Sequence, residues 1–265
     1  MDIVTRYYRL IREAQKMLRK GKWEKGRALI EKAISLCPDK YEGHALLGDY
    51  YGYQGDFELA IKSFRIALDK NPSDALGYCS LGQCLLKTNE SEEAINNLKM
   101  AINLNPKLME AYHFLIPELI TNENQAESYK YLIDAFGYFP DDGKINFLLA
   151  NKLIYCSDDL GIQLTDEVLK YLNKAENTGI DLVGINSLRG DYYYKLKDWE
   201  NAAKYFSKSL VRKYEEDIAL KYADCLCELE DYDLLYDLIS EMSKDGSEIA
   251  KQLMIDHPEC FDELK

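Results

Sequence analysis

The residues best suited to metal or redox chemistry, the cysteines and histidines, are scattered along the chain. Cys225 and Cys227 are the closest cysteines, and with one residue between them they do not share a helix face. His44, His113 and His257 lie far apart and match no zinc-ligand spacing. We therefore predict no metal site and interpret the seven cysteines as reduced thiols of a cytoplasmic protein.

The sequence also lacks the short motifs that carry common catalytic chemistry. It has no P-loop, no GxGxxG, no GxSxG and no HExxH pattern. Acidic pairs are frequent, but such pairs on helix surfaces usually face water. We predict that the protein is not an enzyme and uses no cofactor.

Charge distinguishes the two ends of the chain. The 265 residues are 47% hydrophobic and 30% charged, with a net charge of −13, which favours a folded protein and disfavours generic binding to nucleic acid or to an anionic membrane. Residues 1–40 hold 11 Lys and Arg against 5 Asp and Glu, whereas residues 215–265 hold 4 against 16.

No apolar stretch approaches the length of a membrane span, and the first residues do not form a signal peptide pattern.

A repeat with a period of 34 residues indicates which elements position the remaining candidate side chains. Prolines and alanines both recur at this interval: Pro38, Pro72, Pro106 and Pro140, and Ala33, Ala67, Ala101 and Ala135. Within one period, from Leu47 to Pro72, apolar residues recur at spacings of three and four around a turn at Gly55. This pattern predicts two helices joined by a turn, a unit that buries its apolar face only by stacking on its neighbours.

The pattern resembles the tetratricopeptide repeat (TPR). The resemblance implies an all-α, right-handed α-solenoid of about seven repeats in a single domain, 1–265, closed by a terminal capping helix. The predicted repeats are 7–40, 41–74, 75–108, 109–142, 143–179 with a turn insertion within 157–164, 183–214 and 216–245, followed by a C-terminal cap at 246–265.

In TPR-like folds the first helix of each repeat lines a concave groove in which partner peptides dock. Helical spacing then selects the side chains on that face. The predicted partner-binding residues are Tyr53, Gln83, His113, Phe114, Phe147, Asn151, Tyr155, Asp191, Tyr194 and Asp224.

The chemistry of these groove residues favours certain ligands. We expect the aromatic residues Phe114, Phe147, Tyr155 and Tyr194 to occupy positions that packing does not require, where they would serve as anchors, or else to pack on the next repeat. Asn151 can hold an extended backbone, because its amide both donates and accepts. The acidic groove residues, Asp49 among them, favour a basic or polar segment over an anionic one. We predict that the partner segment is basic or apolar. The Lys/Asn/Arg clamp with which some TPR proteins bind chaperone tails is not matched here.

We predict a non-enzymatic scaffold or adaptor that binds a protein or peptide segment in the groove. One alternative is a structural or self-assembling protein, in which the basic start of one copy meets the acidic end of another in a head-to-tail homo-oligomer. RNA binding is a further alternative, but the net negative charge disfavours it.

Overall fold

The structure is a computed structural model that describes residues 2–122, 124–160, 163–244 and 248–256. These residues form fifteen α-helices and no strand. The helices are α1 (Ile3–Arg19), α2 (Trp23–Leu36), α3 (Tyr41–Gln54), α4 (Phe57–Lys70), α5 (Ala75–Lys87), α6 (Ser91–Leu104), α7 (Met109–Thr121), α8 (Gln125–Tyr138), α9 (Gly143–Leu160), α10 (Glu167–Asn177), α11 (Leu182–Lys195), α12 (Trp199–Leu210), α13 (Glu216–Glu228), α14 (Tyr232–Lys244) and α15 (Glu248–Asp256).

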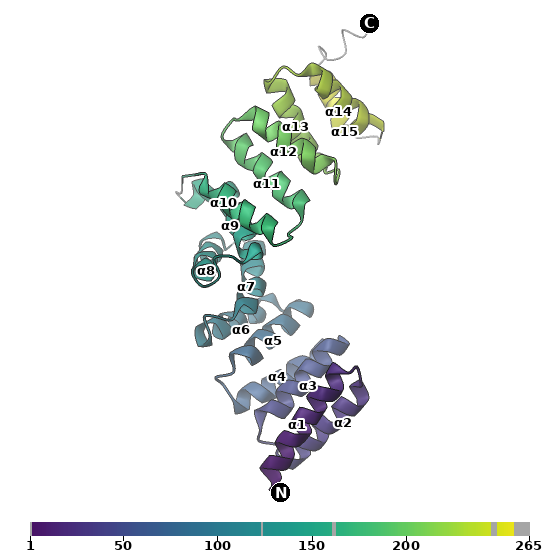
Figure 1. The fold of residues 1–265 in the computed structure, drawn as a ribbon, viewed down its shortest axis with the longest axis vertical. Helices are drawn as coiled ribbons and strands as arrows, with labels where there is room; N and C mark the ends of the chain where they lie inside the picture. Colours follow the sequence, from purple (N-terminus) through teal and green to yellow (C-terminus); the bar gives the residue numbers. More distant parts are fainter. Residues whose placement is uncertain (1, 123, 161–162, 245–247, 257–265) are drawn as a thin grey trace. The chain divides into compact units, whose positions relative to one another are not determined.

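The helices divide into two compact units. Unit 1 is Met1–Tyr138 and contains α1–α8, coloured purple to teal in Figure 1, and unit 2 is Phe139–Lys265 and contains α9–α15. The grouping of residues 1–265 into one functional domain stays a prediction. Of the predicted insertion at 157–164, residues 161–162 lie outside the described residues.

The repeated prolines end the second helix of each pair in unit 1. Asn71 follows the last residue of α4 and precedes Pro72, and it leaves the helical conformation with φ −138° and ψ 84°. The proline ring disfavours the α region for the residue before it, so the helix ends there. Cys37 and Asn105, which precede the prolines after α2 and α6, have nearly the same angles.

Five of the turns inside the helix pairs use a left-handed residue. Gly55 has φ 84° in the turn between α3 and α4, and Gly21 has φ 69° between α1 and α2. Asn89 takes this conformation between α5 and α6, whereas unit 2 uses Lys197 and Glu230 in the corresponding turns. Glycine adopts positive φ without cost, but a residue with a Cβ is strained there.

Small residues let the two helices of a pair approach closely. A Cβ on Gly48 of α3 would lie 2.8 Å from the ring of Phe64 on α4, and one on Gly190 of α11 would lie 2.4 Å from the ring of Phe206 on α12. Phe64 and Phe206 are both buried, so each ring fills the space that its glycine leaves. The recurrent glycine is therefore a packing requirement of the helix pair.

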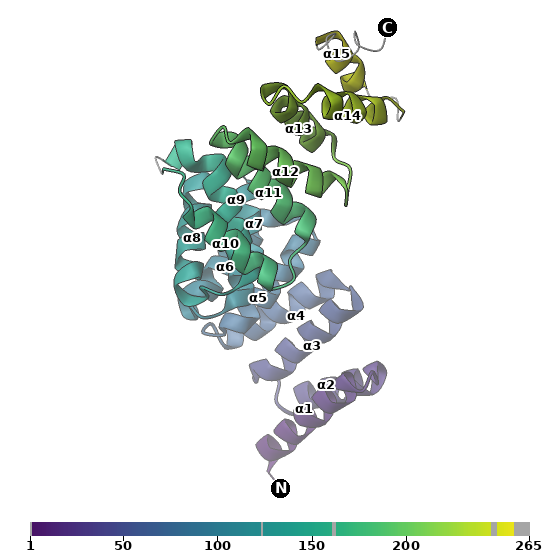
Figure 2. The ribbon, with the colours of Figure 1, turned by 45° about the horizontal axis from the view of Figure 1, so that its top comes forward.

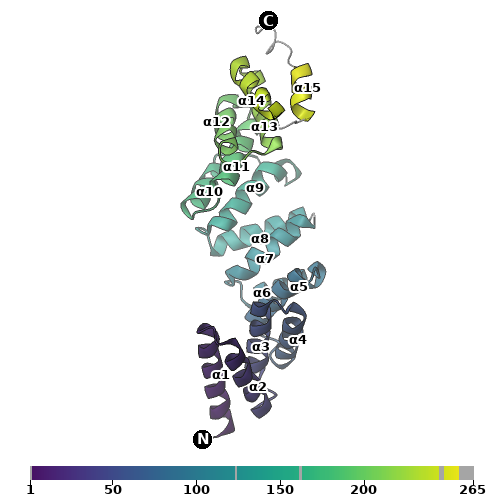
Figure 3. The same cartoon turned by 90° about the vertical axis from the view of Figure 1, so that its right-hand side faces the viewer.

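Within each unit the odd-numbered helices form one face. Each odd helix from α1 to α13 packs against the even helix that follows it, as α1 and α2 do in Figure 3. Successive odd helices also touch, α1 with α3, α3 with α5 and α5 with α7 in unit 1, and α9 with α11 and α11 with α13 in unit 2. No comparable contact joins successive even helices in the described part of the chain. Because helices crowd together on the inner side of a curved stack, we call the odd-helix side of each unit its inner face.

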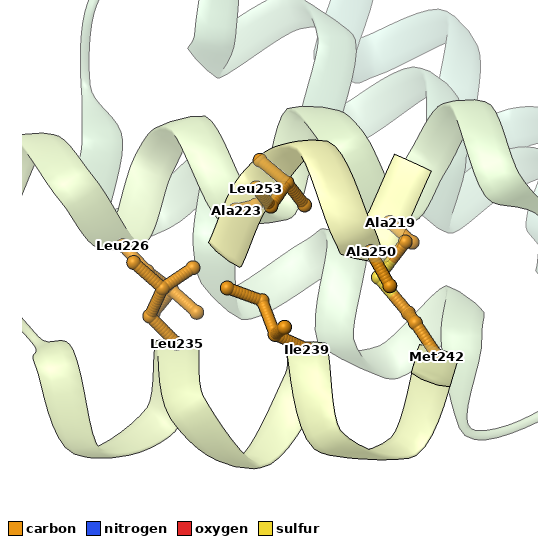
Figure 4. Packing of buried hydrophobic residues seen from close by; sticks show 8 residues of the cluster. All are labelled: Ala219, Ala223, Leu226, Leu235, Ile239, Met242, Ala250 and Leu253. Atoms are coloured by element: carbon orange, nitrogen blue, oxygen red, sulfur yellow. The ribbon is translucent and has the colours of Figure 1, made fainter. Parts of the chain in front are cut away.

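The last helix, α15, covers the end of unit 2, beside α14 (Figure 2). Figure 4 shows the apolar cluster that joins α13, α14 and α15, with Leu226, Leu235 and Ile239 pointing toward one another. Ala250 and Leu253 of α15 complete this cluster. A repeat stack needs such a covering element, since its last pair otherwise exposes an apolar face.

Candidate functional site

The inner face of unit 1 contains a hollow between α3 and α5, which we call the α3–α5 hollow. Its volume is about 480 Å³, and two of the predicted site residues, Tyr53 and Gln83, line it. The full lining is Gly48, Asp49, Gly52, Tyr53, Phe57, Phe64, Ser80, Gln83, Cys84 and Lys87. Aromatic rings, the Asp49 carboxylate, the Lys87 ammonium and a few neutral polar groups thus face one space.

A second, smaller hollow adjoins the first and reaches α1. This α1–α3 hollow has a volume of about 250 Å³ and shares Asp49, Phe64 and Ser80 with the α3–α5 hollow. Its remaining lining residues are Gln15, Tyr41, Glu42, Ala45, Leu46, Asp74, Leu76 and Gly77. Asp49 therefore stands between two connected depressions on the inner face.

The carboxyl group of Asp49 is unusual in its electrostatic surroundings. Its side chain remains open to water, yet it stands among the apolar walls of the hollows. This partial removal from water, with a smaller contribution from the nearby charge of Asp74, raises the pKa of Asp49 to about 6. Within the described residues, Asp49 has no hydrogen-bond or ion-pair partner. Burial, with a contribution from Asp49, also raises the pKa of the Cys84 thiol to about 11, so that thiol stays neutral.

Two large apolar side chains on this face are exposed. Tyr53 is 73% exposed, and its ring stacks on Trp23 of α2 with 4.4 Å between centroids. Leu76, at the start of α5, is 63% exposed in the adjoining hollow. Exposed aromatic and aliphatic side chains beside a depression are typical of partner-binding surfaces.

The other two predicted residues of unit 1, His113 and Phe114, lie on α7 and are half-buried. Neither lines the α3–α5 hollow or the α1–α3 hollow. The structure therefore brings Tyr53 and Gln83 together and leaves His113 and Phe114 away from that site.

In unit 2, the predicted residue Asp191 lies at the centre of a polar network. Asp191 on α11 is only 4% exposed and accepts hydrogen bonds from the Tyr155 hydroxyl on α9 and, at 2.5 Å, from Lys221 Nζ on α13. The Lys221 ammonium also lies 5.8 Å from the centre of the Tyr155 ring. Burial and the bond to Asp191 raise the pKa of Tyr155, which keeps its phenol as a donor.

A second tyrosine–aspartate pair in unit 2, formed by Tyr194 and Asp224, is more exposed. The Tyr194 hydroxyl donates to Asp224 Oδ2 at 2.9 Å. Burial, followed by this bond, raises the pKa of Tyr194 to about 12. The Tyr194 ring also meets Trp199 and Phe206 edge-on, with centroids 5.4 and 6.2 Å apart.

Two of the four aromatic residues, Phe147 and Tyr194, pack on neighbouring helices, and their role as ligand anchors stays a prediction. Phe147 packs against the buried cluster that joins α9, α10 and α11, and its ring lies beside Gly184. Tyr194 packs against the buried cluster of Phe206. Asn151 is half-buried on α9. The alternative stated above, packing on neighbouring helices, describes Phe147 and Tyr194.

Sequence reasoning missed Lys221, although a signal for it existed. Lys221 lies 30 residues after Asp191, close to one repeat length, which places it on the following inner helix. It also missed Trp23 as the support of Tyr53.

Among the described residues, no group of three or more His, Cys, Asp or Glu side chains is placed to hold a metal ion. No described helix is long and apolar enough to span a bilayer.

Comparison with known families identifies the repeat. A family model described as tetratricopeptide repeat matches residues 45–106, the segment that contains the α3–α5 hollow. The chain contains tetratricopeptide repeats. This chain is 30% identical over 95 residues to the anaphase-promoting complex subunit CDC16 of Saccharomyces cerevisiae, and the match covers 33% of this chain and 11% of CDC16. It is 26% identical over 151 residues to the peroxisomal targeting signal receptor of Candida glabrata, which covers 56% of this chain and 25% of the receptor. The chain thus spans a quarter or less of the length of these two relatives.

Solved structures share the fold. PilF of Pseudomonas aeruginosa superposes with a TM-score of 0.65 at 18% identity over 85% of this chain and 99% of that protein. YrrB, described as a TPR protein with an unusual peptide-binding site, superposes with a TM-score of 0.62 at 17% identity over 72% of this chain and 95% of YrrB. At such identities the likeness shows the helical-repeat fold alone.

Proposed function

We propose that this TPR protein is an interaction module whose unit 1 binds a segment of a partner protein on its inner face. The observation that carries the proposal is the α3–α5 hollow, where exposed Tyr53 and the Gln83 amide flank an apolar depression. The ring supplies contact area at little cost in conformational entropy, and the amide can both donate to and accept from a peptide backbone.

Relatives lend support of a general kind. One is named as a receptor for a targeting signal, and one structural neighbour is described by its peptide-binding site. Tetratricopeptide repeat proteins generally act as scaffolds, so we propose a non-enzymatic role for this chain as well. A cytoplasmic location, expected from the thiols, stays a prediction.

The proposal is tested by selection from a displayed library of random twelve-residue peptides against the immobilised full chain. We expect recurrent peptides whose affinity, measured by fluorescence anisotropy, falls at least tenfold in the double variant Tyr53→Ala, Gln83→Ala. The control Ile66→Ala removes an exposed apolar side chain from α4, outside both hollows, and should bind like the wild type. Failure to enrich any peptide, or equal binding by the double variant, would contradict the proposal.

One observation favours the self-assembly alternative as a second candidate. Arg9, Arg12 and Lys16 line an open depression along α1, so the first helix presents a basic surface. An acidic end of a second copy would complement it. Light scattering at increasing salt tests this: a mass that depends on both salt and protein concentration supports self-assembly, and a constant monomer mass excludes it.

A further inference from the structure

The α3–α5 hollow combines an acidic group with aromatic walls in a way that selects one kind of side chain. We infer that it is a subsite for a lysine or arginine side chain of the bound segment, with the cationic head at Asp49 and the aliphatic stem against Phe57 and Tyr53. This inference rests on the proposed function, because it names the chemistry of the partner at that same site.

Charge is the first argument for a cation. The Asp49 carboxylate faces the hollow without an intramolecular partner in the described part of the chain. Because the surrounding apolar atoms already weaken its hydration, an incoming cation gains more from pairing with it than with a carboxylate in open water. An anion would meet repulsion at the same place.

The other charged groups around the hollows do not replace that cation. From α5 and the residue before it come Asp74, Cys84 and Lys87, and of these only Lys87 is positive. Lys87 is exposed and forms no ion pair with Asp49 among the described residues. On α3, Glu42 is engaged by the Tyr8 hydroxyl at 2.9 Å. The remaining titratable lining groups are the phenols of Tyr41 and Tyr53, while α1 contributes neutral Gln15 and α4 contributes neutral Phe57 and Phe64.

Shape is the second argument. Lysine and arginine carry three or four methylene groups below a charged head, so they bury an apolar stem while the head stays polar. The rings of Phe57, Phe64 and Tyr53 supply apolar walls on one side of the hollow. The negative face of an aromatic ring also attracts a nearby cation.

The third argument is that unit 2 contains an intramolecular contact of the same kind, between a lysine, an inner-face aspartate and an aromatic ring. There, Lys221 places its ammonium against Asp191 and beside the ring of Tyr155. In unit 1 the next inner helix, α5, places the short neutral side chain of Ser80 beside Asp49. In unit 2 the next repeat supplies the cation that pairs with Asp191. In unit 1 a partner protein can supply the corresponding cation to Asp49.

The test starts from the peptides selected by the wild-type chain. We expect a lysine or arginine next to apolar residues in the recurrent peptides. Replacing that basic residue by glutamine, or introducing Asp49→Asn into the protein, should weaken binding about tenfold, and the two changes together should weaken it little further. Asp69→Asn is the matched control, because Asp69 is an exposed carboxylate on α4 outside both hollows.

The pH dependence gives an independent readout. Because the cation binds the ionised carboxylate and the pKa of Asp49 is about 6, the affinity of the wild type should fall about tenfold from pH 7.5 to pH 5. The affinity of Asp49→Asn should stay flat over the same range. The chosen peptides carry no histidine or carboxylate, so that only the protein titrates.

The outcomes separate the two proposals. Recurrent peptides without a basic residue, or with equal affinity for the wild type and Asp49→Asn, overturn the lysine or arginine subsite and leave the proposed function in place. A selection that yields no peptide overturns both. A dimer by light scattering that Asp49→Asn dissolves would make a second copy of this chain the occupant and would overturn the partner assigned here.

Discussion

Asp49 in unit 1 and Asp191 in unit 2 are both aspartates on inner-face helices, yet they have opposite environments. Asp191 is buried and accepts bonds from Tyr155 and Lys221, which belong to the preceding and following inner helices. Asp49 is open to water and faces a hollow, where the following inner helix contributes Ser80, Gln83, Cys84 and Lys87 but no hydrogen bond or ion pair to Asp49 among the described residues. An aspartate therefore becomes structural or available for binding according to what the neighbouring repeat places against it.

The two units also differ in the residues that occupy their left-handed turn positions. Unit 1 uses Gly21, Gly55 and Asn89 at its left-handed turn positions, residues that tolerate positive φ. Unit 2 places Lys197 and Glu230 there. Unit 2 thus retains the repeat geometry while its local sequence opposes it, and side-chain networks such as that of Asp191 contribute to holding it.

The largest expected effect tests what the two units share. Phe64→Ala and Phe206→Ala should each lower the free energy of unfolding by about 3–5 kcal/mol, because each removes the ring that fills the space above a glycine. Urea denaturation followed by circular dichroism measures this. A neutral result at either site would show that the glycine–phenylalanine contact does not support that helix pair.

The second prediction tests the pairing of Asp191. Asp191→Ala should cost about 1–3 kcal/mol of unfolding free energy, since it leaves the Tyr155 hydroxyl and the Lys221 ammonium without their acceptor. Asp224→Ala is the matched control: it loses one exposed bond to Tyr194 and should cost less than about 1 kcal/mol. Equal costs for the two aspartates would remove the distinction between a buried and an exposed partner.

The third prediction concerns the turns. Glu230→Gly and Lys197→Gly should each stabilise unit 2 by about 1 kcal/mol, because glycine relieves the left-handed strain. Asn89→Gly in unit 1 should give a smaller gain, since asparagine tolerates this conformation. Thermal unfolding of the three variants checks the order, and a destabilised Glu230→Gly would contradict it.

The smallest expected change in the free energy of unfolding is that of Asp49→Asn, and it depends on pH. The pKa of Asp49 in the folded chain is raised to about 6, so between about pH 4 and 6 the folded chain keeps a proton that the unfolded chain has lost. The unfolding free energy contributed by Asp49 therefore falls as pH rises through that interval. Asp49→Asn should be slightly more stable than the wild type at pH 7.5, by less than about 1 kcal/mol because the group is exposed, and the difference should vanish near pH 4.

Measurement of the unfolding free energy at both pH values, with Asp69→Asn as control, tests this. An Asp49→Asn variant that is less stable than the wild type at pH 7.5 would show that Asp49 has an intramolecular partner. Together with loss of peptide binding, the expected gain would indicate a residue that serves binding at the expense of stability.

Much of the fold could be predicted from the repeated residues. Pro72 ends α4 by restricting Asn71, and Gly55 supplies the left-handed turn, both of which are local effects that a sequence pattern reports directly. The left-handed conformation of Lys197 and Glu230 could not be predicted, because there the tertiary packing of the helix pair overrides local preference.

The candidate site was predictable only in part. Helical spacing placed Tyr53 and Gln83 on one face, and they do line one hollow. The same reasoning gave Phe147 and Tyr194 as ligand anchors, but their rings pack on neighbouring helices. The spacing determines which way a side chain points, whereas its contacts depend on the sizes of the residues one repeat away.

The sequence by itself determined the helix-turn-helix repeat, its 34-residue period and the side of each pair on which polar candidates lie, because these follow from backbone preferences and from apolar spacing along one chain. Only the tertiary structure decided which inner-face aspartate is paired and which is open. That choice depends on the residue that the next repeat places at the corresponding position, a lysine that pairs with Asp191 (Lys221) or a serine in the hollow of Asp49 (Ser80). Whether such an aspartate is paired, and how far it is removed from water, depends on side chains of the neighbouring repeats, so the sequence of one repeat does not determine it.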